Sequence, residues 1–431
     1  MLDIKFIRQN AELVKDAVKK KYMDVDVNRL IELDKQRRKL ITESETLKAQ
    51  QNKLLEKIAK EKNQAAMKKS KELKEKFKVL EKELNSVETE YKKLMWRVPN
   101  IPAPDTPIGP DDSANKEINK WGKPRQFDFE IKDHLALGRE LDIIDTKTGV
   151  KVSGFRGYYL KNEGAFLHLA ILWYCWQKIV EADFKPLIGP TLVFEFVLYG
   201  SGHFPFGREE VYQIGNPRKL AGGEVIGEPL YLAGTSEPTL LSYFSDKVLD
   251  KKNLPIKVCS FSPCYRSEAG SYGKDTHGLY RLHEFMKVEQ VVLCQNDIEE
   301  SNKWLEKMRQ ISESLLQDLE LPYRVVQNAS GDMGAGKYKM YDIETWMPSR
   351  QKYGETHSDS NLTDWQSRRL NIRYKDSNGT IKFVHTLNNT VMASPRILIA
   401  LMENNQQKDG SIIIPEVLRK YLPNKLKSIK K

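Results

Sequence analysis

The first hundred residues carry the most regular apolar pattern in the chain. Leucine recurs every seventh residue from Leu33 to Leu54, and apolar side chains step alternately by four and three from Leu73 to Leu94. This spacing is typical of the seam of a coiled coil. We predict helices over residues 27–62 and 67–97, joined by a short polar segment into an antiparallel hairpin. The first helix would be about 54 Å long, so we expect an arm that projects into solvent.

The pattern changes after a stretch rich in proline. Proline interrupts both helix and strand, so we predict a linker over residues 98–115. Its prolines are Pro99, Pro102, Pro104, Pro107 and Pro110. Beyond it, short apolar runs separated by glycine and proline predict a mixed or antiparallel sheet with helices between the strands. We therefore expect an α+β fold with two domains, a helical arm over residues 1–104 and a large domain over residues 105–431. The predicted strands cover residues 187–198, 258–265, 282–293, 323–326, 370–374 and 381–385, a small hairpin over residues 148–152 turns at Gly149, and a helix covers residues 397–402.

The composition of the 431 residues excludes several classes of protein. Charged residues make up 30% and hydrophobic residues 40%, which is typical of a globular protein with a highly charged surface. No apolar run is long enough for a membrane span, and the first ten residues resemble neither a secretion signal nor a transit peptide, so we expect a cytoplasmic protein. The four cysteines lack the spacing of a zinc site, so we expect unpaired structural thiols and no zinc.

The positive charge is concentrated in the predicted arm. The formal net charge is +11, and residues 1–100 contribute +9 of it, through 26 Lys and Arg against 17 Asp and Glu. Such a field favours a polyanion such as nucleic acid as a partner, because basic side chains neutralise phosphates and release counterions. A solvated, lysine-rich helical surface would have the same charge, so charge alone leaves both interpretations open.

Residues 258–293 predict two antiparallel strands joined by a polar loop that contains glycine. Side chains alternate between the faces of a strand. One face of the second strand is therefore shared by His283, Phe285, Lys287 and Glu289. This face could stack a base on the ring of Phe285 and present charges to a polar ligand, which a plain surface strand would not need. We interpret it as a ligand site.

Three arginines accompany this segment. Arg266 and Arg281 bracket the loop, and Arg396 precedes the predicted helix 397–402. A guanidinium suits phosphate because it stays charged and donates two parallel hydrogen bonds. Converging, the three would suit a nucleoside triphosphate. Taken singly, each would more commonly form a surface ion pair.

Two other patterns are set aside. Gly331, Gly336 and Lys337 have the spacing of a phosphate-binding loop, but Tyr338 stands where a Ser or Thr would hold magnesium. Around the histidines at positions 277, 283 and 385 there is no recognisable Ser or Cys nucleophile. We assign these histidines structural or supporting roles.

One stretch is rich in hard oxygen ligands of the kind that magnesium accepts. It contains Glu355, Ser358, Asn361, Thr363 and Asp364. An exposed acidic loop would have a similar composition. The spacing leaves a magnesium site and a solvated loop equally open.

Together, these blocks resemble the class II seryl-tRNA synthetases over nearly the whole chain. The resemblance rests on the helical hairpin and on ordered matches at residues 98–102, 183–193, 235–237, 265–289, 363–369, 386–396, 403–404 and 415–418. The block 183–193 resembles a dimer-interface motif only loosely, since Asp183 replaces a usual glycine. In the last large block, Ser394-Pro395 stands where many members have a small residue and glycine.

The resemblance implies a class II catalytic domain that binds ATP. Arg266 would contact the α-phosphate and the serine carboxylate. Arg281 would reach the γ-phosphate side of a bent triphosphate. Phe285 would stack on adenine opposite Arg396, and Glu268 would read the adenine edge.

The resemblance also implies a magnesium site and a serine pocket. Magnesium would be held between phosphates by Glu355 and Ser358. The serine pocket would be lined by Thr235, Glu237, Arg266, Glu289, Asn388 and Thr390. Glu289 and Thr390 would face the serine hydroxyl. The implied catalytic set is Arg266, Glu289 and Arg396.

The implied reaction is ATP-dependent activation of L-serine to seryl-adenylate, followed by transfer to tRNA(Ser), and to tRNA(Sec) where one exists. The serine carboxylate is an ionised nucleophile, so the site needs cations that screen two anions rather than a side-chain base. The arm would lie against the long variable arm of the tRNA and contact mainly phosphates. A homodimer is implied, because each active site and the arm that serves it usually belong to different subunits.

Three alternatives predict different features. A paralogue that activates an amino acid without charging tRNA usually lacks the arm, which this chain has. A non-catalytic RNA-binding relative would be expected to have lost Arg266, Glu289 or Arg396, and all three are present. A coiled-coil scaffold would need residues 115–431 to be inert. The residues favour an active serine–tRNA ligase over all three.

Overall fold

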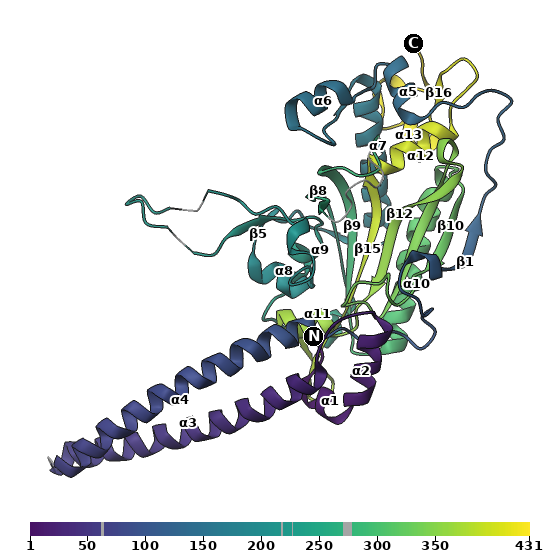
Figure 1. Cartoon of the computed structure of the whole chain (residues 1–431). Coiled ribbons are helices and arrows are strands. Elements are labelled where there is room, and N and C mark those ends of the chain that lie inside the picture. The colour runs from purple at the N-terminus through teal and green to yellow at the C-terminus, as the bar shows by residue number, and fades with distance from the viewer. Residues whose placement is uncertain (62–63, 217–218, 226, 270–277) are drawn as a thin grey trace. The chain divides into compact units, whose positions relative to one another are not determined.

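The computed structural model describes residues 1–431 apart from residues 62–63, 217–218, 226 and 270–277. The chain forms two compact units, Met1–Pro99 and Asn100–Lys431. Within the described residues, the first unit contains only helices and their connections, and the second contains all of the strands (Figure 1).

The first unit is built on a long helical pair. Its helices are α1 (Ile4–Gln9), α2 (Ala11–Lys20), α3 (Val27–Glu61) and α4 (Gln64–Arg97). The predicted hairpin is confirmed, since α3 and α4 pack against each other along their length (Figure 1). The seam residues Leu33, Leu40 and Leu73 are buried, which is why the heptad pattern located both helices. The short helices α1 and α2 were not predicted.

An eight-stranded sheet is the centre of the second unit. Its order is β1-β10-β11-β12-β15-β9-β8-β4, and every neighbouring pair is antiparallel except β4 and β8. The α+β class with a mainly antiparallel sheet is confirmed. The strands are β1 (Lys116–Trp121), β4 (Lys185–Pro186), β8 (Ile256–Tyr265), β9 (Glu284–Cys294), β10 (Tyr323–Gln327), β11 (Lys339–Met347), β12 (Lys352–Asn361) and β15 (His385–Ser394).

Alternation along the central strands sends neighbouring side chains to opposite faces of the sheet. Gln290 of β9 and Asn389 of β15 hydrogen-bond to α10 (Ile298–Asp318), at 3.2 and 2.9 Å. The preceding and following residues, Glu289 and Thr390, meet each other at 3.2 Å. One face of these strands is therefore covered by α10, and Glu289 and Thr390 project from the other.

Helices and smaller sheets complete the second unit. One apolar cluster joins the central strands to α7, α10 and α12. The helices besides α10 are α5 (His134–Glu140), α6 (Thr146–Ser153), α7 (Asn162–Glu181), α8 (Glu195–Ser201), α9 (Glu237–Ser242), α11 (Trp365–Leu370), α12 (Arg396–Asn404) and α13 (Glu416–Arg419). The short strands are β2 (Ile144–Asp145), β3 (Tyr159–Leu160), β5 (Leu192–Phe194), β6 (Leu230–Leu232), β7 (Val248–Asp250), β13 (Arg373–Lys375), β14 (Ile381–Phe383), β16 (Ile412–Ile413) and β17 (Ser428–Ile429).

Three sequence predictions were wrong in detail. The hairpin at Gly149 is helix α6, capped by Asp145, and a Cβ at Gly149 would lie 2.4 Å from the backbone of Tyr158. The glycine therefore permits close packing rather than a turn. The predicted strand 187–198 is a loop over residues 187–191, strand β5 over Leu192–Phe194 and helix α8 from Glu195 onward. The strand 370–374 begins with the last residue of α11.

The prediction of unpaired thiols is confirmed. All four cysteines are buried and none forms a disulfide. Burial raises the pKa of the Cys259 thiol to about 11, so this thiol is protonated at neutral pH. Among the described helices, none combines the length and the apolar character needed to cross a membrane.

Candidate active site

A cavity of about 230 Å³ lies on the face of the sheet opposite α10. Side chains from β9, β12 and β15, from the segment after β8 and from the starts of α9 and α12 line it. The structure brings every predicted site residue to this cavity: Thr235, Glu237, Arg266, Glu268, Arg281, Phe285, Glu289, Glu355, Ser358, Asn388, Thr390 and Arg396. Residues up to 161 positions apart in the sequence thus share one site.

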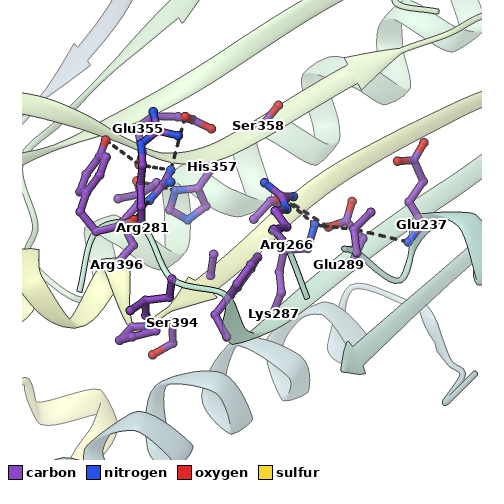
Figure 2. A pocket seen from close by; sticks show the side chains of 18 of the residues that line it. Glu237, Arg266, Arg281, Lys287, Glu289, Glu355, His357, Ser358, Ser394 and Arg396 are labelled. Atoms are coloured by element: carbon purple, nitrogen blue, oxygen red, sulfur yellow. Dashed lines mark hydrogen bonds and ion pairs between the residues drawn. The ribbon is translucent and has the colours of Figure 1, made fainter. Parts of the chain in front are cut away.

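The cavity has two chemically different ends. Figure 2 shows Arg281, Arg396 and Glu355 together at one end, and Arg266, Glu289 and Glu237 toward the other. The strands explain this order. The face of β9 that we interpreted as a ligand site carries Phe285 first, then Lys287 and Glu289. All three side chains line the cavity. The shared face of β9 is confirmed for these three residues.

Arginine and aromatic side chains dominate the first end. The guanidinium of Arg396 lies 4.4 Å from the ring centre of Tyr280, donates to the Glu355 carbonyl at 2.8 Å and pairs with the Glu355 carboxylate at 3.4 Å. Arg281 pairs with Glu268 at 3.3 Å. The first end therefore holds two cations whose partners are carboxylates at the rim of the same cavity.

Arg266 connects the two ends. Its Nε donates to the Gly234 carbonyl at 3.2 Å, and its guanidinium carbon lies 5.4 Å from the ring centre of Phe285. The backbone after β8 is held in place by the residue before β9, since the Arg266 amide donates to the His283 carbonyl at 2.9 Å. These contacts hold a planar cation against a flat ring inside the cavity.

The second end contains a buried ion pair. Lys287 Nζ lies 2.5 Å from Glu289 Oε2, and it donates to the hydroxyls of Thr235 at 2.6 Å and Thr390 at 3.2 Å. Thr390 in turn donates to Glu289 at 3.2 Å. Burial raises the pKa of Glu289, and the nearby Lys287 opposes that shift.

A second carboxylate at this end has neutral partners. Glu237 Oε1 accepts from the amides of Asn388 at 2.8 Å and Gln366 at 2.5 Å. Gln366 is fixed in turn by the Thr386 hydroxyl, at 2.7 Å. Glu237 is only 6% exposed, so its negative charge faces the cavity rather than bulk water. Such a charge suits a ligand ammonium.

Among the described residues, two histidines line the cavity, His203 and His357. Burial lowers the pKa of each to about 3, so both are neutral near pH 7. Of the histidines singled out in the sequence, His283 and His385 lie outside the cavity and contact the Arg266 carbonyl and the Ser301 hydroxyl, and His277 lies outside the described residues.

Only part of the oxygen-rich stretch reaches the cavity. Glu355 and Ser358 line it, whereas Asn361, Thr363 and Asp364 do not. Asn361 donates to Ser301 and Asn302, and Asp364 accepts from Arg368, so the amide and this carboxylate are used in the scaffold.

The residues around Ser358 fit a divalent cation. Asp342 of β11 lies opposite Ser358 in the strand register. Its Oδ1 is buried and makes no hydrogen bond within the part of the chain that the structure describes. Burial and the charge of Glu355 raise the pKa of Asp342 well above its usual value. Carboxylate and hydroxyl oxygens are the ligands that Mg²⁺ prefers, and a cation would relieve both effects.

Comparisons with known proteins agree over the whole chain. Residues 1–102 match the model of the seryl-tRNA synthetase N-terminal domain, and residues 224–405 match the class II synthetase core domain (G, H, P, S and T). A serine–tRNA ligase from Deinococcus radiodurans is 44% identical over 98% of this chain and 97% of its own, and one from Treponema denticola is 42% identical over 98% of each.

The chain belongs to the seryl-tRNA synthetase family. Solved structures support the assignment. The seryl-tRNA synthetase of Pyrococcus horikoshii, complexed with ATP, has a TM-score of 0.85 at 37% identity over 100% of this chain and 99% of its own. The cytoplasmic serine–tRNA ligase of Naegleria fowleri, in complex with AMP, has a TM-score of 0.84 at 30% identity, with coverage of 100% and 99%.

Several residues of this synthetase cavity had no predicted role. They are His203, Tyr280, Lys337, His357 and Ser394. Lys287 was predicted on the ligand-site face of β9, but without a role of its own. Lys337 belongs to the sequence that imitates a phosphate-binding loop, and Gly336 beside it packs against the Trp365 ring instead of a ligand. His203 gave no local signal.

Proposed function

We propose that this cavity joins L-serine to ATP and then passes the seryl group to tRNA(Ser). The identification as a serine–tRNA ligase is confirmed by the relatives. What supports the placement of the reaction is one observation: a single cavity combines phosphate-binding cations, an aromatic platform, oxygen ligands and a buried polar pocket. The proposed site residues are those predicted from the sequence.

ATP takes the arginine end in this proposal. Phe285 and Arg396 hold the adenine between them, and Glu268 accepts from the adenine edge. Arg281 then leaves its ion pair with Glu268 to reach the γ-phosphate side, and Arg266 contacts the α-phosphate. The ion pair between Arg281 and Glu268, at 3.3 Å, supports this change of partner, because both side chains line the cavity that would receive the phosphates.

We propose that Glu355 and Ser358 would hold magnesium beside the bound triphosphate. When bound, it supplies positive charge that neutralises the triphosphate. Asp342 lies opposite Ser358 in the strand register and supports the site through its buried Oδ1, which has no hydrogen-bond partner among the described residues. The relatives' complexes with ATP and AMP support nucleotide binding. Magnesium binding goes beyond them and is part of this proposal.

Serine takes the end that holds the buried carboxylates. Glu237 receives the ammonium group, because its described partners are neutral amides. Arg266 receives the carboxylate, and Glu289 with Thr390 faces the hydroxyl. Thr235 and Asn388 complete the pocket.

The chemistry requires no side-chain base. The serine carboxylate attacks the α-phosphorus as an anion, and pyrophosphate leaves. The chain therefore has to bring two anions together and align them, which Arg266 does by contacting both. The neutral histidines are consistent with this division of labour.

Specificity follows from the polar end. Alanine would leave the Glu289 oxygen that faces the serine hydroxyl unpaired, at a cost of about 1 to 3 kcal/mol. Threonine would have to fit an additional methyl group into the pocket.

The second step uses the first unit. We propose that the basic hairpin α3–α4 binds the long variable arm of tRNA(Ser), and of tRNA(Sec) where present. The net charge of +9 over residues 1–100 supports a phosphate-binding role. We also propose that residues 1–104 act as a tRNA-binding domain and residues 105–431 as the catalytic domain, in the cytoplasm. A paralogue that does not charge tRNA is disfavoured, since residues 1–102 match the synthetase N-terminal domain.

A homodimer is part of the proposal. Helix α7 exposes an apolar stripe at helical spacing, formed by Phe166, Leu169, Trp173 and Val180, each 40–51% exposed. An apolar groove of about 440 Å³ is lined in part by residues 187–197, which overlap the block 183–193 that loosely resembles a dimer-interface motif. Exposed apolar surface of this kind is typical of subunit interfaces.

Serine-dependent exchange between ATP and pyrophosphate tests the proposed reaction. We expect exchange with serine and at most weak exchange with threonine or alanine. Exchange that does not depend on serine would contradict the function. Sedimentation of the intact chain tests the dimer separately, and a monomer at micromolar concentration would contradict it.

A further inference from the structure

Lys287 is the most enclosed cation of the serine end, and the reaction proposed above does not use it. Its side chain is 5% exposed, and that of Glu289 is 2% exposed. It meets acceptors from three separate segments: Glu289 on β9, Thr235 before α9 and Thr390 on β15. A lysine ammonium has three protons and no acceptor, so these contacts use its full donor capacity.

These contacts fix the direction of the surrounding hydrogen bonds. The hydroxyls of Thr235 and Thr390 both accept from Lys287, so each must direct its own proton elsewhere. Thr390 directs its proton to Glu289 Oε2, the oxygen that also pairs with Lys287. The described bonds to this carboxylate thus converge on Oε2. Oε1 is the oxygen that can accept a proton from a ligand.

We propose that Lys287 is a specificity-determining residue, which holds Glu289 as a carboxylate so that the pocket accepts a hydroxyl proton and selects serine over alanine. This inference rests on the proposed function, because it takes Glu289 as the group that meets the serine hydroxyl. Lys287 acts through Glu289 and the two threonines, and is in that sense a positioning residue.

The electrostatics of the pocket support this role. Burial alone favours the neutral carboxyl form of Glu289 and raises its pKa, whereas Lys287 favours the ionised form. A neutral carboxyl group could donate as well as accept, and would no longer require a donor from the ligand. The other titratable or charged groups around the pair are Glu237, Arg266, Cys264, His203 and Lys337.

The sign of the pH effect follows from this arrangement. Without Lys287 the pKa of Glu289 rises further, because desolvation is then opposed mainly by the weaker effect of the Thr390 hydrogen bond. The serine-binding carboxylate is lost as pH falls through that pKa. The acid limb of kcat/KM for serine should therefore move to higher pH when Lys287 is removed, and a purely structural defect would not move it.

The test uses Lys287→Met in the full chain, with Lys339→Met as the matched control. Lys339 is also an ion-paired sheet lysine, 2.6 Å from Asp105, and lies outside the cavity. Serine- and alanine-dependent pyrophosphate exchange is measured from about pH 6 to pH 9, with the KM for ATP recorded. For Lys287→Met we expect kcat/KM for serine to fall about 100-fold and the serine-to-alanine ratio to fall at least about 10-fold. The KM for ATP and the control should stay within about twofold of the original chain.

A double-mutant cycle with Glu289→Gln isolates the coupling. Once Glu289 cannot ionise, adding Lys287→Met should change the serine-to-alanine ratio by less than about twofold. Lys287→Arg keeps a cation and should keep the acid limb near its original position. If Lys287→Met does not fold, Lys287→Arg is the variant that is compared with the original chain.

Three results would overturn the proposal: equal losses for serine and alanine, an acid limb that stays in place in Lys287→Met, or additive effects in the cycle. Failure of the proposed function looks different, because the unaltered chain would then show no serine-dependent exchange.

Discussion

Two ion pairs, one in each unit, show how burial changes what the same chemistry does. Arg37 of α3 and Glu88 of α4 meet at 3.0 Å, with about 30% of each side chain exposed. Lys287 and Glu289 meet at 2.5 Å and are almost fully enclosed. Water and salt screen the first pair, whereas the second acts in a medium of low polarity. The arm therefore uses its charges as a surface field, and the cavity uses them as fixed, directional groups.

The largest effect should come from the cation that spans the two ends of the cavity. Arg266→Met removes the proposed contact to both reacting anions, and we expect serine-dependent exchange to fall about 1000-fold. We expect Arg266→Met to remain folded despite this loss, and circular dichroism of the variant checks this. Exchange within tenfold of the original would contradict the placement of the reaction at Arg266.

Removing the arm should show that the two units have separate functions. Deletion of about residues 35–90 should lower aminoacylation of tRNA(Ser) at least about 100-fold and leave pyrophosphate exchange within about twofold, because the field of the arm acts only on the polyanion. Both assays are run on the same preparation. Equal losses in both would contradict the proposed division between binding and chemistry.

Neutralising the second buried carboxylate should have an intermediate effect. Glu237→Gln keeps the size of the side chain and removes the charge proposed to meet the serine ammonium. We expect the KM for serine to rise about 30-fold, equivalent to about 2 kcal/mol for a charged hydrogen bond. The KM for ATP is the internal control, and a matching rise there would argue against a serine-specific role.

The smallest effect should come from the exposed pair. Arg37→Met should lower the free energy of unfolding by only about 0.5 kcal/mol, and the difference should shrink in high salt. Urea unfolding at low and high salt measures it. A salt-independent loss above about 2 kcal/mol would show that this pair behaves like the buried one.

Sequence patterns located the elements best where one local period dominates. The seam from Leu33 to Leu54 follows one helix, so its heptad period predicted α3 nearly to its ends. The same reasoning failed at Gly149. Helix α6 is short, and it has a glycine there because the backbone of Tyr158 leaves no room for a side chain. A contact between segments leaves no period in the sequence.

The candidate site was found by two kinds of information. Strand alternation placed Phe285, Lys287 and Glu289 on one face, and the resemblance supplied residues on other segments, such as Asn388. The role of Lys287 escaped both, since its partners Thr235 and Thr390 are 52 and 103 positions away.

The sequence by itself determined the helical arm, the location of its positive charge, the α+β class and the family, because periodicity, composition and motifs are properties of neighbouring residues. Only the tertiary structure decided which charges are buried together, which are screened by water and which hydroxyls a lysine orients. Those properties depend on solvent exclusion and on distances of a few ångströms between segments. Such distances are fixed by packing and strand register rather than by any local pattern.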